Sequence, residues 1–207
     1  MKIGILALQG AFIEHEHMLQ QLGAECVELR KSRDLAAELD GIVLPGGEST
    51  VQGKLLRELG MYEELKKRIH QGLPVLATCA GLILLAEQVC DTKKSRAAEG
   101  CFAALPVVVR RNAYGRQPGS FSDRTKIRGI PKEEEFFPLE FIRAPYIVSL
   151  RDTKEVEPIA VIGKLPDGSS GENIVGVRYH NQIGLAFHPE LTQDARCHEM
   201  FLSMCHA

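Results

Sequence analysis

A cysteine, a histidine and a glutamate in this chain are of the types, and in the sequence settings, that nucleophilic attack on an amide requires. Cys79 lies between two apolar runs, in Leu73-Pro74-Val75-Leu76-Ala77-Thr78-Cys79-Ala80-Gly81-Leu82. This pattern predicts a strand, a sharp turn and a helix, which would place the thiol at the exposed end of a sheet. A thiolate over the first amides of a helix is both stabilised and reachable.

His188 and Glu190 are candidates for the base and for the residue that orients it. Only Pro189 separates them, so on an extended segment both side chains would point the same way, stiffened by the proline. The carboxylate could then fix the imidazole tautomer while the imidazole takes the thiol proton. We therefore predict a triad of Cys79, His188 and Glu190.

A glycine pair after a third apolar run is a candidate oxyanion hole. Gly46 and Gly47 follow the apolar stretch 41–44. Glycine amides are unhindered, and the amide of Ala80, at the start of the predicted helix, would join them. We predict that Gly46, Gly47 and Ala80 form the oxyanion hole. Each motif also has an ordinary structural explanation: Cys79 as a core thiol, His188-Pro189-Glu190 as a loop tripeptide and Gly46-Gly47 as a tight turn. Their joint position at strand ends favours a catalytic role instead.

The apolar pattern of the first half predicts alternating strands and helices. We expect strands at 2–8, 26–29, 41–44 and 75–78, and helices at 12–22, 34–39, 50–59 and 62–71. This order predicts an α/β fold with a doubly wound, mostly parallel sheet flanked by helices. Ligands of such sheets bind at the carboxyl ends of the strands, where Gly46 and Cys79 both fall.

The second half is less regular and predicts a small antiparallel flap that returns the chain to the main sheet. We expect strands at 107–110, 140–142, 158–162, 174–179 and 183–187, and a closing helix at 193–204. The polar, glycine-containing stretches 91–104 and 163–173 are expected to be surface loops.

Length and charge favour one cytoplasmic domain. The 207 residues suffice for a single well-cored domain over 1–207 without a linker. The net charge of −2, with acids and bases interspersed, argues against nucleic acid or an anionic membrane as a partner. The first apolar stretch reaches Gly10 too soon for a signal peptide or a membrane span. Small molecules or proteins remain as partners.

Cysteines and histidines raise the question of disulfides and metals. The six cysteines could form three disulfides or bind metal, but a chain that is 44% hydrophobic and lacks a C-x-x-C pair favours free thiols. His15 and His17 could be a metal pair, but i, i+2 spacing on a helix points the rings apart. We expect a solvated helix face there, and no metal or cofactor.

Three motifs resemble the signatures of class I, or triad-type, glutamine amidotransferases, which have a flavodoxin-like fold. They are Pro45-Gly46-Gly47-Glu48-Ser49-Thr50, Thr78-Cys79-Ala80-Gly81-Leu82-Ile83 and Phe187-His188-Pro189-Glu190-Leu191-Thr192. More narrowly, the chain resembles the glutaminase subunits of pyridoxal 5′-phosphate synthases. That resemblance also rests on Leu8-Gln9-Gly10-Ala11, Arg111-Asn112, Gly115-Arg116-Gln117 and Phe141-Ile142-Arg143-Ala144-Pro145.

The resemblance implies a reaction and a partner. Cys79 would attack the side-chain amide of L-glutamine, His188 would protonate the departing ammonia, and water would hydrolyse the thioester. The ammonia would pass to a separate (β/α)₈-barrel synthase subunit, which makes pyridoxal 5′-phosphate as a product of the complex. Pyridoxal 5′-phosphate would not be a cofactor here, because no Schiff-base lysine is indicated.

The resemblance also implies a glutamine site. Its residues would be Gly47, Glu48, Ser49, Arg111, Ile142 and Arg143. An arginine fork suits the α-carboxylate of glutamine and Glu48 offers a countercharge to its α-ammonium. Without the resemblance, Arg111 and Arg143 would be solvated arginines at a sheet edge.

Two alternatives stay open at this stage. One is a glutaminase that serves a different acceptor, such as an imidazole-glycerol-phosphate-type cyclase, against which the motif 141–145 speaks. The other is a non-catalytic regulatory module of the same fold, against which the intact triad speaks. Stretches 93–104 and 164–173 are longer than in the family's pattern, and inserted loops can change partner contacts. We also expect the Gly46-Gly47 turn to be misformed in the free chain and completed by partner contact.

Overall fold

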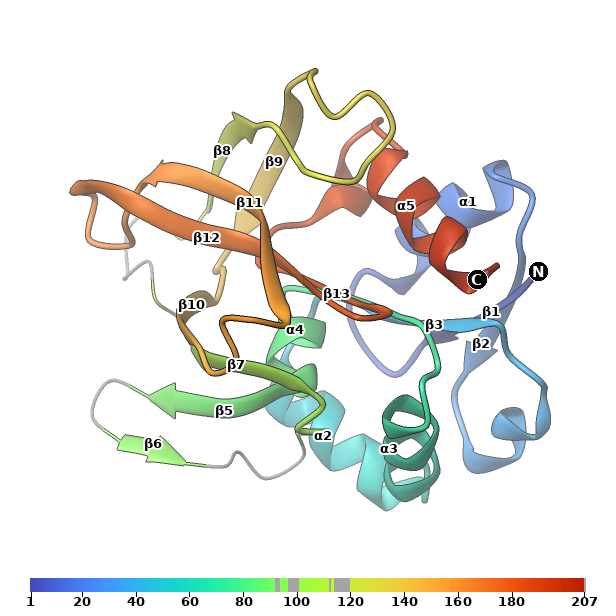
Figure 1. The fold of residues 1–207 in the computed structure, drawn as a ribbon. Helices are drawn as coiled ribbons and strands as arrows, with labels where there is room; N and C mark the ends of the chain where they lie inside the picture. The colour runs from blue at the N-terminus through green and yellow to red at the C-terminus, as the bar shows by residue number, and fades with distance from the viewer. Residues whose placement is uncertain (92–93, 97–100, 112, 114–119, 207) are drawn as a thin grey trace.

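A seven-stranded sheet runs through the centre of the molecule and carries the loops of the candidate site (Figure 1). The computed structural model describes residues 1–206 except 92–93, 97–100, 112 and 114–119. The strands of this sheet are β1 (Lys2–Leu6), β2 (Glu25–Leu29), β3 (Gly41–Leu44), β4 (Val75–Thr78), β11 (Val156–Lys164), β12 (Ser170–Tyr179) and β13 (Gln182–Leu185). Their order across the sheet is β11-β12-β13-β4-β3-β1-β2.

The five strands from β2 to β13 are parallel, which brings their carboxyl ends to one edge. Leu44 of β3 pairs with Ala77 of β4, and Thr78 of β4 pairs with Leu185 of β13. The residues that follow these strands therefore meet: the glycine turn after β3, Cys79 after β4 and His188 shortly after β13. Strands β12 and β11 extend the sheet in antiparallel fashion. The predicted doubly wound, mostly parallel sheet is confirmed.

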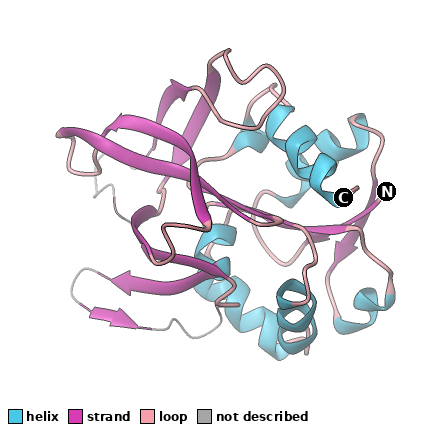
Figure 2. Cartoon of the chain, in the orientation of Figure 1, coloured by secondary structure: helices cyan, strands magenta, loops and turns pink. Residues whose placement is uncertain are grey.

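Helices cover both faces of the sheet (Figures 1 and 2). Helices α1 (Phe12–Gln21) and α5 (Arg196–Cys205) lie on one face, and α2 (Ser49–Glu58), α3 (Tyr62–His70) and α4 (Ala80–Leu85) lie on the other. Their spacing explains the packing, since α3 buries Tyr62, Leu65 and Ile69, at i, i+3 and i+7 of one helical face. Two 3₁₀ helices, η1 (Ser32–Ala36) and η2 (Pro189–Leu191), lie in connections.

Two smaller sheets form the remaining part of the molecule. Strands β5 (Ala86–Asp91), β6 (Lys94–Arg96), β7 (Leu105–Arg110) and β10 (Tyr146–Leu150) form a sheet of order β10-β7-β5-β6, and β8 (Ser120–Thr125) pairs with β9 (Phe137–Ile142). Strand β9 alternates, burying Phe137, Leu139 and Phe141. Phe141 packs edge-on against Phe187, with ring centroids 6.0 Å apart. This contact fixes the end of β9 beside the end of β13.

One continuous cluster of buried side chains joins both halves of the chain. It includes Leu44 and Leu76 of the parallel sheet together with Phe141 and Phe187 from the second half. The two ends of the described chain also lie near each other in Figure 1. The single domain over residues 1–207 stays a prediction.

The structure corrects several predicted elements. The expected helix at 34–39 is the 3₁₀ helix η1. Stretch 163–173 is a surface loop only over residues 165–169: β11 and β12 form a long hairpin on either side, and Asn173 is fully buried. In stretch 91–104, which lies partly outside the described residues, β6 forms and Phe102 is buried. Strands β5, β6, β8 and β10 were not predicted, so the flap is larger than expected.

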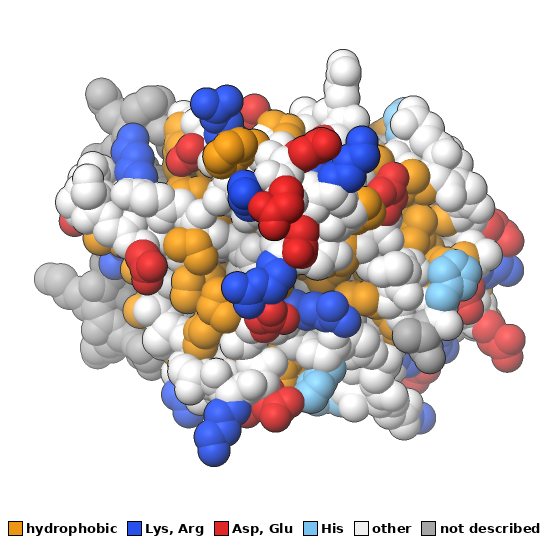
Figure 3. Space-filling model, turned by 45° about the horizontal axis from the view of Figure 1, so that its top comes forward, with side chains coloured by type: hydrophobic (Ala, Val, Ile, Leu, Met, Phe, Trp, Pro, Cys, Tyr) orange, Lys and Arg blue, Asp and Glu red, His pale blue; other side chains and the backbone are white. Residues whose placement is uncertain are grey.

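Surface charge is mixed, and no described helix suits a bilayer. On the face drawn in Figure 3, acidic and basic side chains interleave instead of gathering by sign. Arg196 and Asp194, 2.6 Å apart, and Arg128 and Glu157, 2.8 Å apart, are examples of such pairing. Within the part of the chain that the structure describes, no helix combines the length and apolar character that crossing a membrane requires. The six cysteines are free thiols, as predicted.

Candidate active site

Cys79 occupies a strained turn between β4 and α4. Its backbone has φ 48° and ψ −102°, a region that residues other than glycine rarely adopt. The turn is held because the Cys79 amide donates a hydrogen bond to the Leu185 carbonyl of β13, 2.8 Å away. Strain of this kind persists where the surrounding structure over-determines it, as at the nucleophile of a strand-turn-helix elbow. The predicted position of the thiol at the end of the sheet is confirmed.

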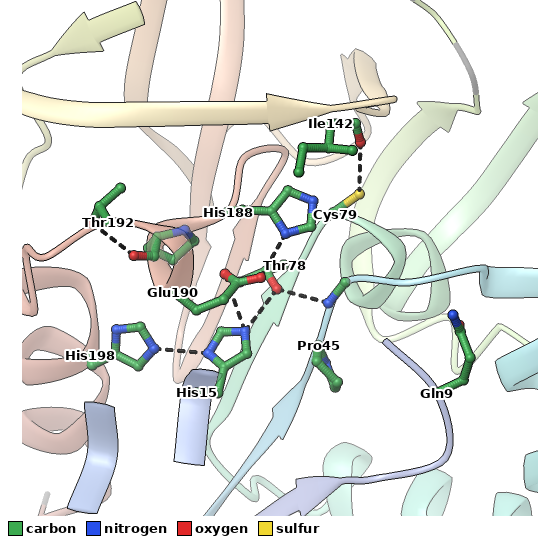
Figure 4. Close-up of polar contacts among 12 residues, drawn as sticks. Gln9, His15, Pro45, Thr78, Cys79, Ile142, His188, Glu190, Thr192 and His198 are labelled. Atoms are coloured by element: carbon green, nitrogen blue, oxygen red, sulfur yellow. Dashed lines mark hydrogen bonds and ion pairs between the residues drawn. The ribbon is translucent and has the colours of Figure 1, made fainter. Parts of the chain in front are cut away.

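The His188 ring lies between Cys79 and Glu190 (Figure 4). Its Nδ1 is 2.6 Å from Glu190 Oε1, and its backbone amide donates to the Glu140 carbonyl of β9, 2.8 Å away. Burial opposes the charged ring, but hydrogen bonds with Cys79 and Glu190, reinforced by their charges, raise the pKa of His188 to about 10. The ring is therefore charged at neutral pH and faces the sulfur, whose hydrogen bond in this structure goes to the Ile142 carbonyl, 3.8 Å away.

Glu190 is a buried carboxylate behind the histidine. Burial would raise the pKa of Glu190, but the imidazole rings of His15 and His188 that face it hold the pKa below its usual value. The sequence-based reason for its orientation was partly wrong. Pro189 begins the 3₁₀ helix η2, so the turn of that helix, and not an extended segment, brings Glu190 back to the ring.

His15 corrects the expectation of a solvated helix face. Its side chain is fully buried, with Nδ1 2.8 Å from Nε2 of His198 and Nε2 3.1 Å from Oγ1 of Thr78. Only His17 of the pair is exposed. The signal for this burial is present in the sequence, because His15 shares a helical face with Met18 and Leu19 at i+3 and i+4.

The glycine turn after β3 offers one free amide. The Gly46 amide donates to Oγ1 of Thr78 at 3.1 Å, and the Glu48 amide donates to Oε1 of Gln9 at 2.6 Å. The amide of Gly47, between them, has no hydrogen-bond partner among the described residues. In this conformation the Gly46 N–H is already used, so its predicted role as an oxyanion donor stays a prediction that would need the turn to change. Gly47 and Ala80 remain the predicted donors.

A pocket of about 640 Å³ opens over these groups. The predicted site residues that line it are Gly46, Gly47, Glu48, Ser49, Cys79, Ala80, Arg111, Ile142, Arg143 and His188. Glu190 is the one predicted site residue that does not line the pocket, since it lies behind His188. The structure thus brings the predicted residues together, and their individual roles stay predictions.

The pocket carries both signs of charge. Arg111 reaches it from the end of β7, and its Nη1 donates to Oγ1 of Thr50 at 2.9 Å. Arg143 follows β9 with φ 45°. Glu48 caps α2 by accepting hydrogen bonds from the Thr50 and Val51 amides. Partial burial opposes the effect, but these bonds lower the pKa of Glu48. A zwitterion of amino-acid size finds complementary groups here.

Some lining residues were not predicted as site residues. They are Gly10, Ala11, Glu14, Thr50, Ile83 and Leu191. Gly10 has φ 100° and the Ala11 amide donates to the Gly46 carbonyl at 3.2 Å, so the segment after β1 supports the glycine turn. The motif 8–11, already noted for its resemblance, was the available signal. Asn112 and residues 115–117 lie outside the described residues.

A metal site finds no support in the described part of the chain. No three histidine, cysteine, aspartate or glutamate side chains gather there in an arrangement suited to a metal ion. The groups that the site itself offers are a thiol, an imidazole and a carboxylate.

Sequence comparisons find similar proteins over nearly the full chain. Residues 5–207 match the SNO glutamine amidotransferase family. The pyridoxal 5′-phosphate synthase subunit PdxT of Desulfitobacterium hafniense (strain DSM 10664 / DCB-2) is 54% identical over 202 residues, which cover 98% of this chain and 92% of that relative. The protein of the same name from Haemophilus influenzae (strain PittEE) is 45% identical, covering 99% and 98%.

Structural comparisons agree. A crystal structure of a glutamine amidotransferase superposes with a TM-score of 0.84 at 39% identity, covering 99% of both chains. The structure of PurLQS from Thermotoga maritima superposes with a TM-score of 0.60 at 16% identity, covering 98% of this chain and 97% of that one. At that identity the second likeness concerns the fold alone.

Proposed function

The chain belongs to the SNO glutamine amidotransferase family, and we propose that it is the glutaminase subunit of a pyridoxal 5′-phosphate synthase. The observation that carries this proposal is the His188 ring, which is 2.6 Å from Glu190 on one side and faces the Cys79 thiol on the other, at the floor of a pocket. The chain works as one glutaminase domain over residues 1–207, in the cytoplasm, where its free thiols stay reduced.

The first half-reaction begins at the sulfur. The Cys79 thiolate attacks the δ-carbonyl carbon of L-glutamine, forming a C–S bond while the carbonyl electrons move onto the oxygen. The oxyanion is stabilised by the amides of Gly47 and Ala80. His188, protonated and oriented by Glu190, then gives its proton to the nitrogen as the C–N bond breaks. Ammonia leaves and a glutamyl thioester remains on Cys79.

The second half-reaction regenerates the thiol. His188, now neutral, takes a proton from water as the water oxygen attacks the thioester carbonyl. The C–S bond breaks, glutamate is released and the proton returns to the Cys79–His188 pair. Atoms balance as glutamine plus water giving glutamate plus ammonia, without a metal or cofactor in the step.

Substrate recognition uses the charged rim of the pocket. Arg143, with Arg111 beside it, binds the α-carboxylate of glutamine, because a guanidinium fork matches a carboxylate. Glu48 faces the α-ammonium, and Gly47, Ser49 and Ile142 complete the walls. Fixing both ends of the amino acid orients its side-chain amide toward Cys79.

The partner is a synthase subunit that consumes the ammonia. We assign it the (β/α)₈-barrel that the family resemblance implies, and ammonia passes to it without release into solvent. In the free chain, the side chain of Gln9 holds the Glu48 amide next to the predicted oxyanion donor Gly47. Partner contact would complete the hole, so turnover depends on the complex.

The test is ammonia release from L-glutamine by the purified chain, alone and with a pyridoxal 5′-phosphate synthase barrel subunit. Cys79→Ala serves as the control. Release that requires both the partner and Cys79 is the expected result. Release by the chain alone would overturn partner dependence but keep the chemistry, whereas no Cys79-dependent release in either case would overturn the proposed function.

A further inference from the structure

Three buried polar side chains lie behind the triad and take no part in the reaction as derived. They are His15 on α1, Thr78 at the end of β4 and His198 on α5, each fully buried. Burying polar groups costs free energy unless they are hydrogen-bonded. None of the three lines the pocket, so substrate contact does not account for them.

These side chains form a connected row that ends on the triad carboxylate (Figure 4). His198 Nε2 is 2.8 Å from His15 Nδ1. His15 Nε2 is 3.1 Å from Thr78 Oγ1 and 3.3 Å from Glu190 Oε2. Thr78 Oγ1 in turn accepts a hydrogen bond from the Gly46 amide at 3.1 Å. His15 therefore contacts both the carboxylate that orients His188 and the hydroxyl that holds the glycine turn.

The contacts determine where the His15 proton lies. Burial lowers the pKa of His15 and the pKa of His198, so both rings are neutral and each carries one N–H. If His15 Nε2 carried a lone pair, it would face the acceptor oxygen Oε2 of Glu190 with no proton between them. With the proton on Nε2, the N–H donates to Thr78 Oγ1, and its positive end lies beside Glu190 Oε2, 3.3 Å from the nitrogen.

The rest of the row fits this assignment. His15 Nδ1 is then an acceptor and receives the N–H of His198 Nε2. His198 Nδ1, which is buried without a hydrogen-bond partner among the described residues, is then a lone pair and not an N–H. An unpaired acceptor is tolerated better than an unpaired donor. Glu190 Oε1 thus accepts the N–H of His188, whereas Oε2 has no hydrogen-bond partner among the described residues and has the electrostatic contact with His15 Nε2, 3.3 Å away.

We propose that His15 is a positioning residue of the glutaminase, which holds Glu190 in register with His188 and, through Thr78, ties the triad to the oxyanion turn. This inference rests on the proposed function. Loss of the Nε2–H removes the N–H dipole that faces the buried Oε2 of Glu190 and frees the carboxylate to turn away from His188. The bound substrate touches none of these groups, so the loss falls on kcat and leaves KM for glutamine unchanged.

The test compares His15→Leu, His15→Gln and the matched control His17→Leu in the complex with the synthase subunit. Leucine removes both ring nitrogens, whereas the glutamine amide restores a donor near the Nε2 position. His17 lies on the same helix but is exposed and outside the row. We expect His15→Leu to lower kcat by about 10- to 100-fold with KM within about twofold. His15→Gln should recover a large part of the loss, and His17→Leu should match the wild type.

A second readout needs no turnover. The rate of Cys79 alkylation by iodoacetamide reports the reactivity of the sulfur, which depends on its pairing with His188. This rate should fall in His15→Leu but not in His17→Leu. If the wild-type complex shows no Cys79-dependent ammonia release, the proposed function fails. The alkylation rates then still test whether His15 positions the groups around Cys79. The inference would be overturned if His15→Leu had the kcat and the alkylation rate of the wild type. It would also be overturned if His15→Gln had a kcat no higher than that of His15→Leu at equal Tm.

A second pair of variants covers the case in which His15→Leu does not fold. Thr78→Val removes the hydroxyl at nearly constant shape, and Thr78→Ser keeps it. We expect kcat of the serine variant to exceed that of the valine variant by about tenfold, because only serine can join Nε2 of His15 to the Gly46 amide. Equal kcat in the two variants would overturn the link between the triad and the turn.

Discussion

A methyl group on Gly46 would lie 2.3 Å from Cε1 of the His188 ring. The turn after β3 and the His188 ring, the proposed base, are therefore packed against each other with no space for a side chain. The sequence suggested that Gly46 supplies an oxyanion amide, but its N–H bonds Thr78. Gly46 has no side chain and so leaves room for the imidazole ring, which only glycine allows.

Substituting Gly46→Ala should therefore remove activity while the sheet still forms. The added methyl must push the His188 ring or the turn by more than half an ångström, and misplacement of about 1 Å costs about 100-fold in rate. We expect kcat/KM for glutamine in the complex to fall by at least about 100-fold. Gly163→Ala is the control, because a methyl there meets no atom within 4 Å. Activity within about threefold of the wild type would show that the turn and the ring move apart easily.

The charge of Glu190 is the subject of a second prediction. Glu190→Gln keeps the size of the side chain but removes the charge that stabilises the imidazolium and allows an amide N–H to face Nδ1 of His188. We expect kcat to fall by about 10²- to 10⁴-fold, as for the neutral substitution in related triads. Steady-state ammonia release measures it, with the exposed Glu63→Gln as the control. A kcat close to that of Glu63→Gln would make Glu190 a structural carboxylate only.

A third prediction concerns the substrate carboxylate. Arg143 lines the pocket and is exposed to it. Arg143→Met removes a charge-assisted hydrogen bond worth about 1.5–3 kcal/mol, so KM for glutamine should rise about 10- to 100-fold while kcat changes little. Arg33→Met, at a solvated arginine on η1, is the matched control. A fall in kcat with unchanged KM would instead assign Arg143 to the reaction or to the partner interface.

The parallel half of the fold was predictable because its signals are local. Continuous apolar runs bounded by glycine and proline gave β3 and β4 with the residue limits that the structure has, Gly41–Leu44 and Val75–Thr78. Once the strands are parallel, the convergence of Gly46, Cys79 and His188 follows from topology alone. The catalytic centre was therefore the easiest part of the site to predict.

The missed features depend on partners distant in sequence. Strand β8 reads Ser-Phe-Ser-Asp-Arg-Thr, with no apolar run, and forms because β9 pairs with it from Phe137 to Ile142. The spacing of His15 and His17 predicts a solvated helix face, whereas the residue that His15 contacts, His198, lies 183 residues away. The Gly46 amide was assigned to the oxyanion because the Thr78 hydroxyl that binds it belongs to another strand. Local pattern carries no information on such pairings.

The protonated state of His188 gives a prediction about stability against pH. The folded-state pKa of about 10 lies above the value of 6.5 that the unfolded chain retains. The ring therefore stabilises the fold fully below about pH 6.5, and this contribution is lost as the pH rises through about 10. The free energy of unfolding of the wild type should exceed that of His188→Gln by a few kcal/mol at pH 6.5, and the difference should shrink toward pH 10.

Urea unfolding at pH 6.5, 8 and 10 measures this difference. Cys79→Ala is the informative second variant. It removes one of the two hydrogen bonds that raise the pKa of His188, so its stability should begin to fall at lower pH than in the wild type. A difference between wild type and His188→Gln that stays constant from pH 6.5 to 10 would mean that His188 is neutral in the folded protein. The first step of the reaction would then have to begin with proton transfer to His188.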